Sequence, residues 1–199
     1  MQHFHLMPKL MKKSSIALLI IFSIVLIDQV AKIWVKTTMS LGESFPVFGN
    51  WFYISFVENE GIAFGISFGE NIGKLLLSLL RIAVVTILIY YLFSLIKKRQ
   101  ANWFVVVILS LVIAGALGNI IDSIFYGVIW GYAPFLYGRV VDMFYFRLFR
   151  IPDWSPLWGG EYFFPAIFNV ADACTTIGIF AIIIWNKKFF NHKKEELTN

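Results

Sequence analysis

The sequence predicts an integral membrane protein of the α-helical class, with four transmembrane helices and two longer loops on one side of the bilayer. The composition is the first indication, because 59% of the residues are hydrophobic and only 15% are charged. Soluble domains carry about a quarter charged residues. Four separated apolar runs, and the Lys and Arg clusters beside them, are the other two indications. A length of 199 residues fits one membrane domain, 1–199.

The first predicted span covers about residues 14–35 and follows Lys9, Lys12 and Lys13. Its beginning is similar to a signal peptide. A run of about twenty apolar residues is nevertheless long enough to cross a bilayer. No small-x-small cleavage pattern follows the run, so we expect the segment to be retained as a helix.

The next loop, residues 37–73, has the composition of strands and turns. Trp51–Val57 is aromatic and β-branched, which is typical of a β-strand, and the polar sequence Glu58-Asn59-Glu60-Gly61 follows it as a turn. The charged residues of this loop are all acidic. We therefore expect a small β-structure outside the membrane.

Three more apolar runs complete the predicted spans, at about residues 75–96, 103–125 and 169–186. Gly115 and Gly118 are small residues of the kind that lets membrane helices approach one another closely. Segment 127–167 is too polar and too rich in Pro, Gly and Trp to cross a membrane. We expect short strands and an interfacial segment there.

The distribution of basic residues predicts the orientation. Ten of the 17 lie in the N-terminal segment, the short loop at 97–102 and the C-terminal tail. Because Lys and Arg concentrate on the cytoplasmic side, both termini and that short loop are expected in the cytoplasm. The 37–73 and 127–167 loops are then extracytoplasmic. The net charge of +5 reflects these flanking clusters and does not indicate a nucleic-acid partner.

With this orientation, every ionisable group embedded in the spans falls in the outer half of the membrane, together with the amides of Asn119 and Asn169. Their convergence predicts one polar site at the outer interface; they are Asp28, Lys32, Arg81, Asn119, Asp122, Asn169 and Asp172. Asp28 and Lys32 are four residues apart on one helix face, which favours a structural ion pair over a direct catalytic role. An alternative for Lys32 and Asp122 is that they are helix-end residues reaching toward the headgroups.

Asp142 and Asp172 carry the chemical hypothesis. An acid at the start of a membrane helix is costly and indicates a functional site. Two neighbouring carboxyl groups that share one proton can activate a water molecule and polarise an amide carbonyl. The alternative is that Asp172 only satisfies the start of a helix and that Asp142 is a loop residue.

Five blocks occur in order along the chain: Asp28-Gln29-x-x-Lys32, Asn59-x-Gly61-x-Ala63-Phe64, Gly115-Ala-Leu-Gly118-Asn119-x-x-Asp122, Val140-Val141-Asp142 and Phe168-Asn169-Val170-Ala171-Asp172. Together they resemble the lipoprotein signal peptidase (signal peptidase II) family of bacteria, a family of membrane aspartyl proteases. The resemblance covers about residues 16–185.

The resemblance implies an aspartic endopeptidase that removes the signal peptide of a prolipoprotein, just before a cysteine that already carries diacylglycerol. It implies Asp142 and Asp172 as the catalytic pair. Residues matching the positions that shape the pocket and hold substrate are Asp28, Lys32, Asn59, Gly61, Asn119, Asp122, Asn169 and Ala171. The loop around 45–66 would match a small β-cradle. The implied enzyme is a monomer without metal or cofactor, in the bacterial cytoplasmic (inner) membrane, with membrane lipid around it and its site at the extracytoplasmic face.

Two departures from the family pattern stand out. Ser123 follows Asp122 where the family usually has Arg, and our hypothesis is that Arg81 or Arg139 supplies the missing cation. Segments 123–139 and 147–166 are longer than in a compact family member. Trp154 and Trp158, in the second of them, are typical of headgroup depth.

Two other functions remain as alternatives. A small proton-coupled transporter could use Asp28 and Lys32 as a relay, although transporter sites lie near the midplane between paired repeats, and we find no repeat. An inactive relative that acts as a binding scaffold is kept open by Ser123 and disfavoured by the two aspartates. The single cysteine, Cys174, excludes a disulfide framework and a CxxC metal site, and we interpret it as a packing residue.

Overall fold

The computed structural model describes residues 7–60, 70–155 and 159–187. The chain forms two compact units, each assembled from segments that are distant in the sequence. The helical unit comprises Met1–Ile27, Leu75–Ile121 and Val170–Asn199. The sheet unit comprises Asp28–Lys74 and Asp122–Asn169.

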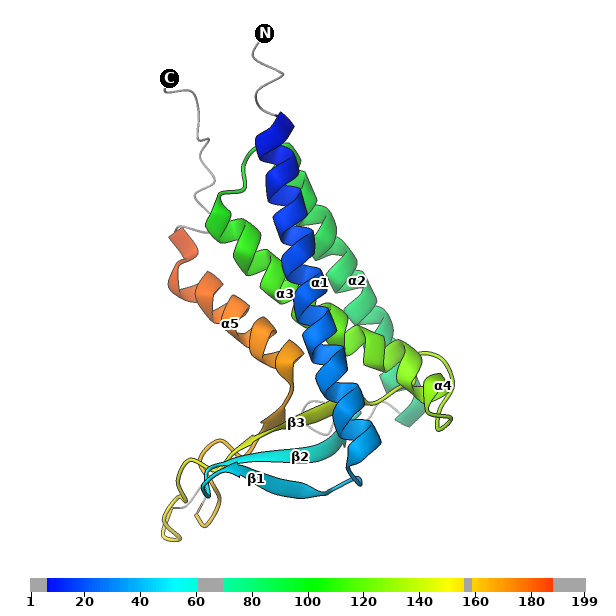
Figure 1. Cartoon of the computed structure of the whole chain (residues 1–199), viewed down its shortest axis with the longest axis vertical. Coiled ribbons are helices and arrows are strands. Elements are labelled where there is room, and N and C mark those ends of the chain that lie inside the picture. Colours follow the sequence, from blue (N-terminus) through cyan, green and yellow to red (C-terminus); the bar gives the residue numbers. More distant parts are fainter. Residues whose placement is uncertain (1–6, 61–69, 156–158, 188–199) are drawn as a thin grey trace. The chain divides into compact units, whose positions relative to one another are not determined.

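Each predicted span falls on a helix (Figure 1). The helices are α1 (Met7–Thr38), α2 (Glu70–Lys97), α3 (Trp103–Ile121), which continues through a π-helical turn η2 (Asp122–Tyr126) into α4 (Gly127–Ile129), and α5 (Val170–Ile184). Within the described part of the chain, three helical stretches are long and apolar enough to cross a membrane: Lys12–Thr38, Ile72–Lys97 and Trp103–Ile129. Helix α5 is apolar but has only 15 residues. The four-span count and the cytoplasmic termini therefore stay predictions.

Close packing of α3 against α5 is the main contact of the helical unit. A Cβ atom at Gly115 would overlap the Thr175 hydroxyl and the Ala171 carbonyl, and one at Gly178 would overlap a methyl of Val112. Small residues thus let the two backbones approach, as the sequence predicted for Gly115. The Phe104 and Trp185 rings meet edge-to-face at 6.2 Å at the other end of this pair.

The sheet unit contains a four-stranded antiparallel sheet (Figure 1). Its strands are β1 (Ser44–Phe48), β2 (Phe52–Asn59), β3 (Val140–Phe146) and β4 (Ile167–Phe168), paired in that order. The predicted strand at 51–57 is confirmed as β2, but the strand continues through Glu58 and Asn59, so the turn predicted at these two residues is wrong. The predicted short strands in 127–167 are confirmed as β3 and β4, and β3 pairs with both β2 and β4. The last part of the expected cradle, residues 61–66, lies outside the described residues.

Aromatic side chains follow the two-residue period of the strands. Phe52 stacks on its cross-strand partner Phe146 at 4.8 Å on one face. On the other face Tyr53 pairs with Tyr145, and the Arg147 guanidinium lies 4.1 Å from the centre of the Tyr53 ring. Such cross-strand pairs fix the register of β2 against β3.

In the longer segment at 147–166, residues 149–151 pair with residues 160–163 as a ribbon. Arg150 and Tyr162 form an isolated antiparallel β-bridge, and the Ile151 N–H donates to the Glu161 carbonyl at 2.8 Å. The Phe149 and Phe163 rings stack with their centres 4.7 Å apart. Trp154 is 84% exposed at the turn, whereas Trp158 lies outside the described residues.

Candidate active site

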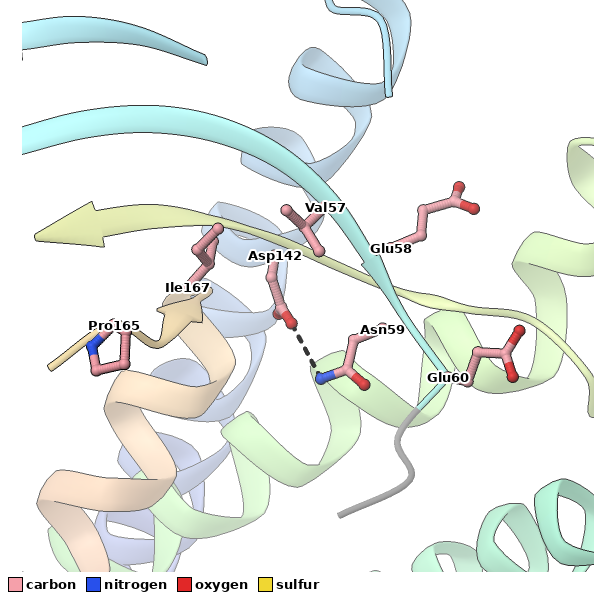
Figure 2. Close-up of a pocket in the computed structure, with 7 residues that line it drawn as sticks. All are labelled: Val57, Glu58, Asn59, Glu60, Asp142, Pro165 and Ile167. Atoms are coloured by element: carbon pink, nitrogen blue, oxygen red, sulfur yellow. Dashed lines mark hydrogen bonds between the residues drawn. The ribbon is translucent and has the colours of Figure 1, made fainter. Parts of the chain in front are cut away.

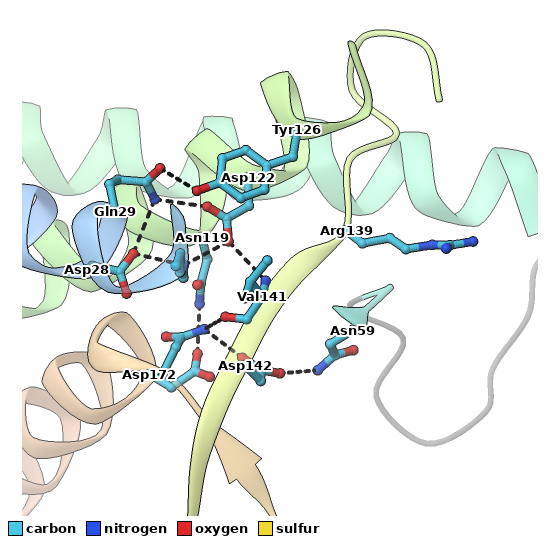
Figure 3. A network of polar contacts seen from close by, with 12 residues as sticks. Asp28, Gln29, Asn59, Asn119, Asp122, Tyr126, Arg139, Val141, Asp142 and Asp172 are labelled. Carbon is cyan, nitrogen blue, oxygen red and sulfur yellow. Dashed lines mark hydrogen bonds and ion pairs between the residues drawn. The ribbon is translucent and has the colours of Figure 1, made fainter. Parts of the chain in front are cut away.

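Asp142 lies inside β3 and is only 2% exposed, so the alternative that it is a loop residue is wrong. Each of its carboxylate oxygens accepts a hydrogen bond from a side-chain amide. The Asn59 Nδ2 donates to Oδ2 at 3.2 Å, and the Asn169 Nδ2 donates to Oδ1 at 2.6 Å (Figure 3). Asn169, which is fully buried, also donates to the Val141 carbonyl at 3.2 Å. The carboxylate is thus held in one orientation.

A β-bulge determines which residue of β2 reaches Asp142. Ile54 pairs with Phe144, but three residues later Val57 pairs with Asp142, two residues earlier in β3, so β2 carries one extra residue. Side chains alternate between the faces of a strand, so the extra residue exchanges the faces of β2 beyond it. As a result Asn59, and not Glu58, lies on the face of Asp142.

The end of β2 and the carboxylate of Asp142 border an open pocket of about 410 Å³. Its lining residues are Val57, Glu58, Asn59, Glu60, Asp142, Pro165 and Ile167 (Figure 2). Figure 2 shows the Asn59 amide directed at Asp142 and the Glu58 side chain directed away from it. A chain segment in this pocket would lie against the carboxylate.

Asp172 belongs to the helical unit and stands in the first turn of α5. Its Oδ1 accepts a hydrogen bond from the Asn119 Nδ2 at 2.7 Å (Figure 3). Asn119 lies one turn beyond Gly115 on α3, and Ala171 next to Asp172 is fully buried. The close approach of α3 and α5 therefore brings this amide to this carboxylate. An acid in a first turn is also favoured by the helix dipole, so the structural alternative for Asp172 stands beside the catalytic one.

A buried charge cluster lies beside β3. The Lys32 Nζ is 2.8 Å from a carboxylate oxygen of Asp28 and 2.8 Å from one of Asp122, and none of the three side chains is exposed. The predicted Asp28–Lys32 pair is confirmed. The alternative that Lys32 and Asp122 reach toward headgroups is wrong, because both are fully buried and paired with each other.

Two members of this cluster were not predicted from the sequence. Gln29 donates from Nε2 to Asp122 at 2.9 Å, and the Tyr126 hydroxyl donates to the Gln29 Oε1 at 3.1 Å (Figure 3). Asp122 and Tyr126 begin and end the π-helical turn η2. Such turns recur at functional sites. The position of Gln29 directly after Asp28 was the available signal for its role.

The charge cluster is connected to the strand that carries Asp142. The backbone N–H of Val141 donates to the Asp122 Oδ2 at 3.2 Å. The Asp28–Lys32–Asp122 cluster thus fixes β3 one residue before Asp142, which supports a structural role.

The remaining predicted residues are distributed as follows. Gly61 lies outside the described residues. Arg81 is half-buried on α2, in the helical unit. Arg139 lies in the sheet unit, 3.1 Å from Glu60 and 3.4 Å from Glu58, and Ser123 is 2% exposed. Over the described ranges, no group of three or more His, Cys, Asp and Glu side chains is placed to hold a metal ion.

Comparison with known proteins identifies the family. Residues 20–188 match the family model of signal peptidase (SPase) II. A lipoprotein signal peptidase of Porphyromonas gingivalis is 48% identical over 85% of this chain and 81% of its own length. One from Staphylococcus aureus is 37% identical over 90% of this chain and 93% of its own.

A solved bacterial membrane enzyme, determined by the in meso method at 1.9 Å resolution, shares the fold with a TM-score of 0.62. It is 36% identical to this chain and covers 85% of it, and the match takes in 91% of the solved chain. The resemblance read from the five blocks is confirmed, and the chain belongs to the signal peptidase II family of bacterial membrane proteases.

Proposed function

We propose that this protein removes the signal peptide from bacterial prolipoproteins, cleaving before the cysteine that carries diacylglycerol. Membership of the signal peptidase II family supports this activity, as do the lipoprotein signal peptidases among its relatives. The substrate is a lipid-anchored protein in the cytoplasmic membrane. The enzyme acts as a monomer at the extracytoplasmic face, where the acyl chains of the substrate stay in lipid.

The proposed chemistry uses Asp142 and Asp172 as one catalytic pair. One carboxylate accepts a proton from a water molecule, whose oxygen then attacks the carbonyl carbon of the scissile amide. The other carboxyl group is protonated, hydrogen-bonds the carbonyl oxygen and later gives its proton to the departing amine. General acid–base help of this kind contributes about 10²–10⁴-fold to the rate. The reaction requires no metal or cofactor.

The observation that carries the proposal is the environment of Asp142. Burying a carboxylate at the wall of a pocket costs free energy unless its oxygens are hydrogen-bonded. Each oxygen of Asp142 accepts a hydrogen bond from a side-chain amide. A carboxylate fixed in this way at a pocket is suited to act on a bound peptide. The Asn119 amide supports the corresponding role of Asp172.

The other site residues have supporting roles in this proposal. Asn59, Asn119 and Asn169 orient the two carboxyl groups, and Asp28, Lys32 and Asp122 hold β3 in place. Gly61 and Ala171 match family positions that shape the pocket, and their part in the proposal rests on the resemblance alone. The sequence predicts that Arg81 or Arg139 replaces the cation that the family usually carries at the position of Ser123. Arg139 is engaged with Glu58 and Glu60, which favours Arg81 for this role.

The test is cleavage by the purified protein in detergent. A diacylglyceryl-modified prolipoprotein and the same protein without the lipid are the two substrates, and mass spectrometry locates the new N-terminus. We expect cleavage of the lipidated protein alone, directly before its modified cysteine. A folded protein that cleaves neither substrate would favour the scaffold or transporter alternative.

A further inference from the structure

We propose that Arg139, together with Lys36, is a positioning device that holds the end of β2 so that Asn59 stays on Asp142. This inference rests on the proposed function, because it concerns the geometry of the catalytic carboxylate. It assigns Arg139 a role different from that of a cation facing the substrate. In Figure 3 the Arg139 side chain points away from Asp122 and Asp142.

Arg139 and Asp142 lie on opposite faces of the β2–β3 pair, so the ion pairs of Arg139 are separated from the catalytic carboxylate. Beyond the bulge, Asn59 is opposite Val140 and Glu58 is opposite Val141. Glu58 and Glu60 therefore share the face of Arg139, whereas Asn59 shares the face of Asp142. An ion pair on either neighbour of Asn59 fixes the backbone that carries its amide, without touching the carboxylate.

Both neighbours of Asn59 are anchored in this way. The Lys36 ammonium pairs with Glu58, and both side chains are only 9% exposed. Arg139 reaches Glu58 at 3.4 Å and Glu60 at 3.1 Å. The Arg139 guanidinium therefore bridges the residue before Asn59 and the residue after it.

An aromatic side chain fixes the two cations in turn. The Tyr132 ring lies 5.0 Å from the Lys36 Nζ and 5.5 Å from the Arg139 guanidinium carbon, within cation–π range. Its hydroxyl also accepts a hydrogen bond from the Arg139 backbone N–H at 2.7 Å. Burial raises the pKa of Tyr132, so this residue keeps its neutral hydroxyl.

The rings of Phe56 and Trp130 complete the surroundings of the Lys36 Nζ, at 5.5 and 5.3 Å. The lysine is therefore held by one carboxylate and three rings. Packing of this kind fixes the distal end of α1 to the end of β2.

An anchor is needed here because Asn59 is the last residue of β2 and is exposed. Strand ends open far more easily than strand centres. An isolated ion pair at a surface contributes little, but Glu58 is nearly buried and belongs to a network of two cations and a tyrosine. Loss of Arg139 would leave Glu60 without this partner and loosen the residues on both sides of Asn59.

A double-mutant cycle tests whether Arg139 acts through Asn59. Arg139→Gln should lower kcat for the lipidated prolipoprotein about tenfold with KM within about twofold, because the bound substrate is unchanged while the carboxylate loses its orientation. In an Asn59→Ala background, the same substitution should change kcat less than about twofold. Arg150→Gln is the matched control, since Arg150 makes an exposed ion pair on the ribbon of the same unit, and it should leave kcat unchanged.

Hydrogen exchange gives a second readout that does not depend on activity. Arg139→Gln should increase deuterium uptake in peptides covering the end of β2, and Arg150→Gln should not. Glu60→Gln, at a side chain that is 44% exposed, is a second variant that keeps the fold and should act in the same direction.

Equal losses of kcat from Arg139→Gln in both backgrounds, or unchanged exchange at the end of β2, would overturn the inference. A wild-type protein that cleaves no prolipoprotein would instead contradict the proposed function, and the exchange result would still decide the role of Arg139.

Discussion

At the scale of single residues, the feature that dominates this protein is the buried Lys32 with its two carboxylate partners. All three side chains are fully buried, so each charge depends on the others for compensation. The cluster also receives the Gln29 amide and reaches the backbone of β3 through Asp122. Its stability is therefore expected to depend on the balance of charge and not on any one pair.

Replacement of Lys32 tests this dependence. Lys32→Met leaves two buried carboxylates without their cation, and we expect it to cost about 3–5 kcal/mol of stability. Asp28→Asn and Asp122→Asn added to Lys32→Met remove the uncompensated charge and should recover much of the loss. Thermal unfolding in detergent measures both. A single variant as stable as wild type would show that the cluster does not hold the sheet unit together.

The buried charged residues could be recognised from the sequence. The cost of placing a charge inside an apolar run depends on the neighbouring residues in the sequence and not on the tertiary structure. An acid or a lysine inside an apolar run is visible without a structure, which is why Asp28, Lys32, Asp122 and Asp172 were all predicted. The partnership of Lys36 and Glu58 could not be predicted. It joins residues 22 positions apart whose approach depends on the register of β2.

At the scale of secondary-structure elements, the contact of α3 with α5 positions the Asn119–Asp172 pair. The contact depends on Gly115, where an added Cβ would meet backbone at Ala171, and on Gly178, where it would meet a side-chain methyl of Val112. A methyl group can move aside more easily than a backbone carbonyl. A Gly→Ala substitution is therefore expected to disturb the packing of α3 on α5 more at Gly115 than at Gly178.

We expect Gly115→Ala to lower both kcat and the unfolding temperature, because it forces the helices apart one turn from Asn119. Gly178→Ala, in the same interface but further from Asp172, should reduce activity several-fold less. The measurement is the cleavage rate of both variants beside their thermal unfolding. Equal losses of activity would mean that the spacing of α3 and α5 does not act through the Asn119–Asp172 hydrogen bond.

The elements themselves were predictable to different degrees. Long apolar runs and the aromatic β-branched stretch at 51–57 identify helices and a strand from local composition. The bulge between Ile54 and Val57 is a feature of the pairing of β2 with β3, and the π-helical turn at Asp122–Tyr126 carries the two side chains that contact Gln29. No local sequence pattern predicts either feature. They nevertheless decide which side chains reach Asp142 and Gln29.

At the scale of the whole molecule, the distribution of charge predicts the orientation in the membrane. The basic clusters predict that loops 37–73 and 127–167 are extracytoplasmic and that the 97–102 loop is cytoplasmic. Cysteine labelling can test this in a Cys174→Ala background. Leu41 is 62% exposed and Gln100 is exposed, so Leu41→Cys and Gln100→Cys are suitable reporters.

A membrane-impermeant maleimide added to right-side-out vesicles should label Leu41→Cys directly. Gln100→Cys should react only after the vesicles are permeabilised. Labelling of Gln100→Cys in intact vesicles would reverse the predicted topology and place the proposed site on the cytoplasmic side.

The central claim is that Asp142 and Asp172 together hydrolyse the prolipoprotein, and single-turnover cleavage with excess enzyme tests it most directly. Asp142→Asn and Asp172→Asn should each lower the cleavage rate by about 10³-fold or more, since each removes one of the two proton-transfer groups. Asp153→Asn is the control, because its carboxylate is 82% exposed on the ribbon, and a metal chelator should have no effect on the wild-type rate. If either Asp142→Asn or Asp172→Asn cleaves at a rate near that of the wild type and of Asp153→Asn, the two-aspartate mechanism is contradicted.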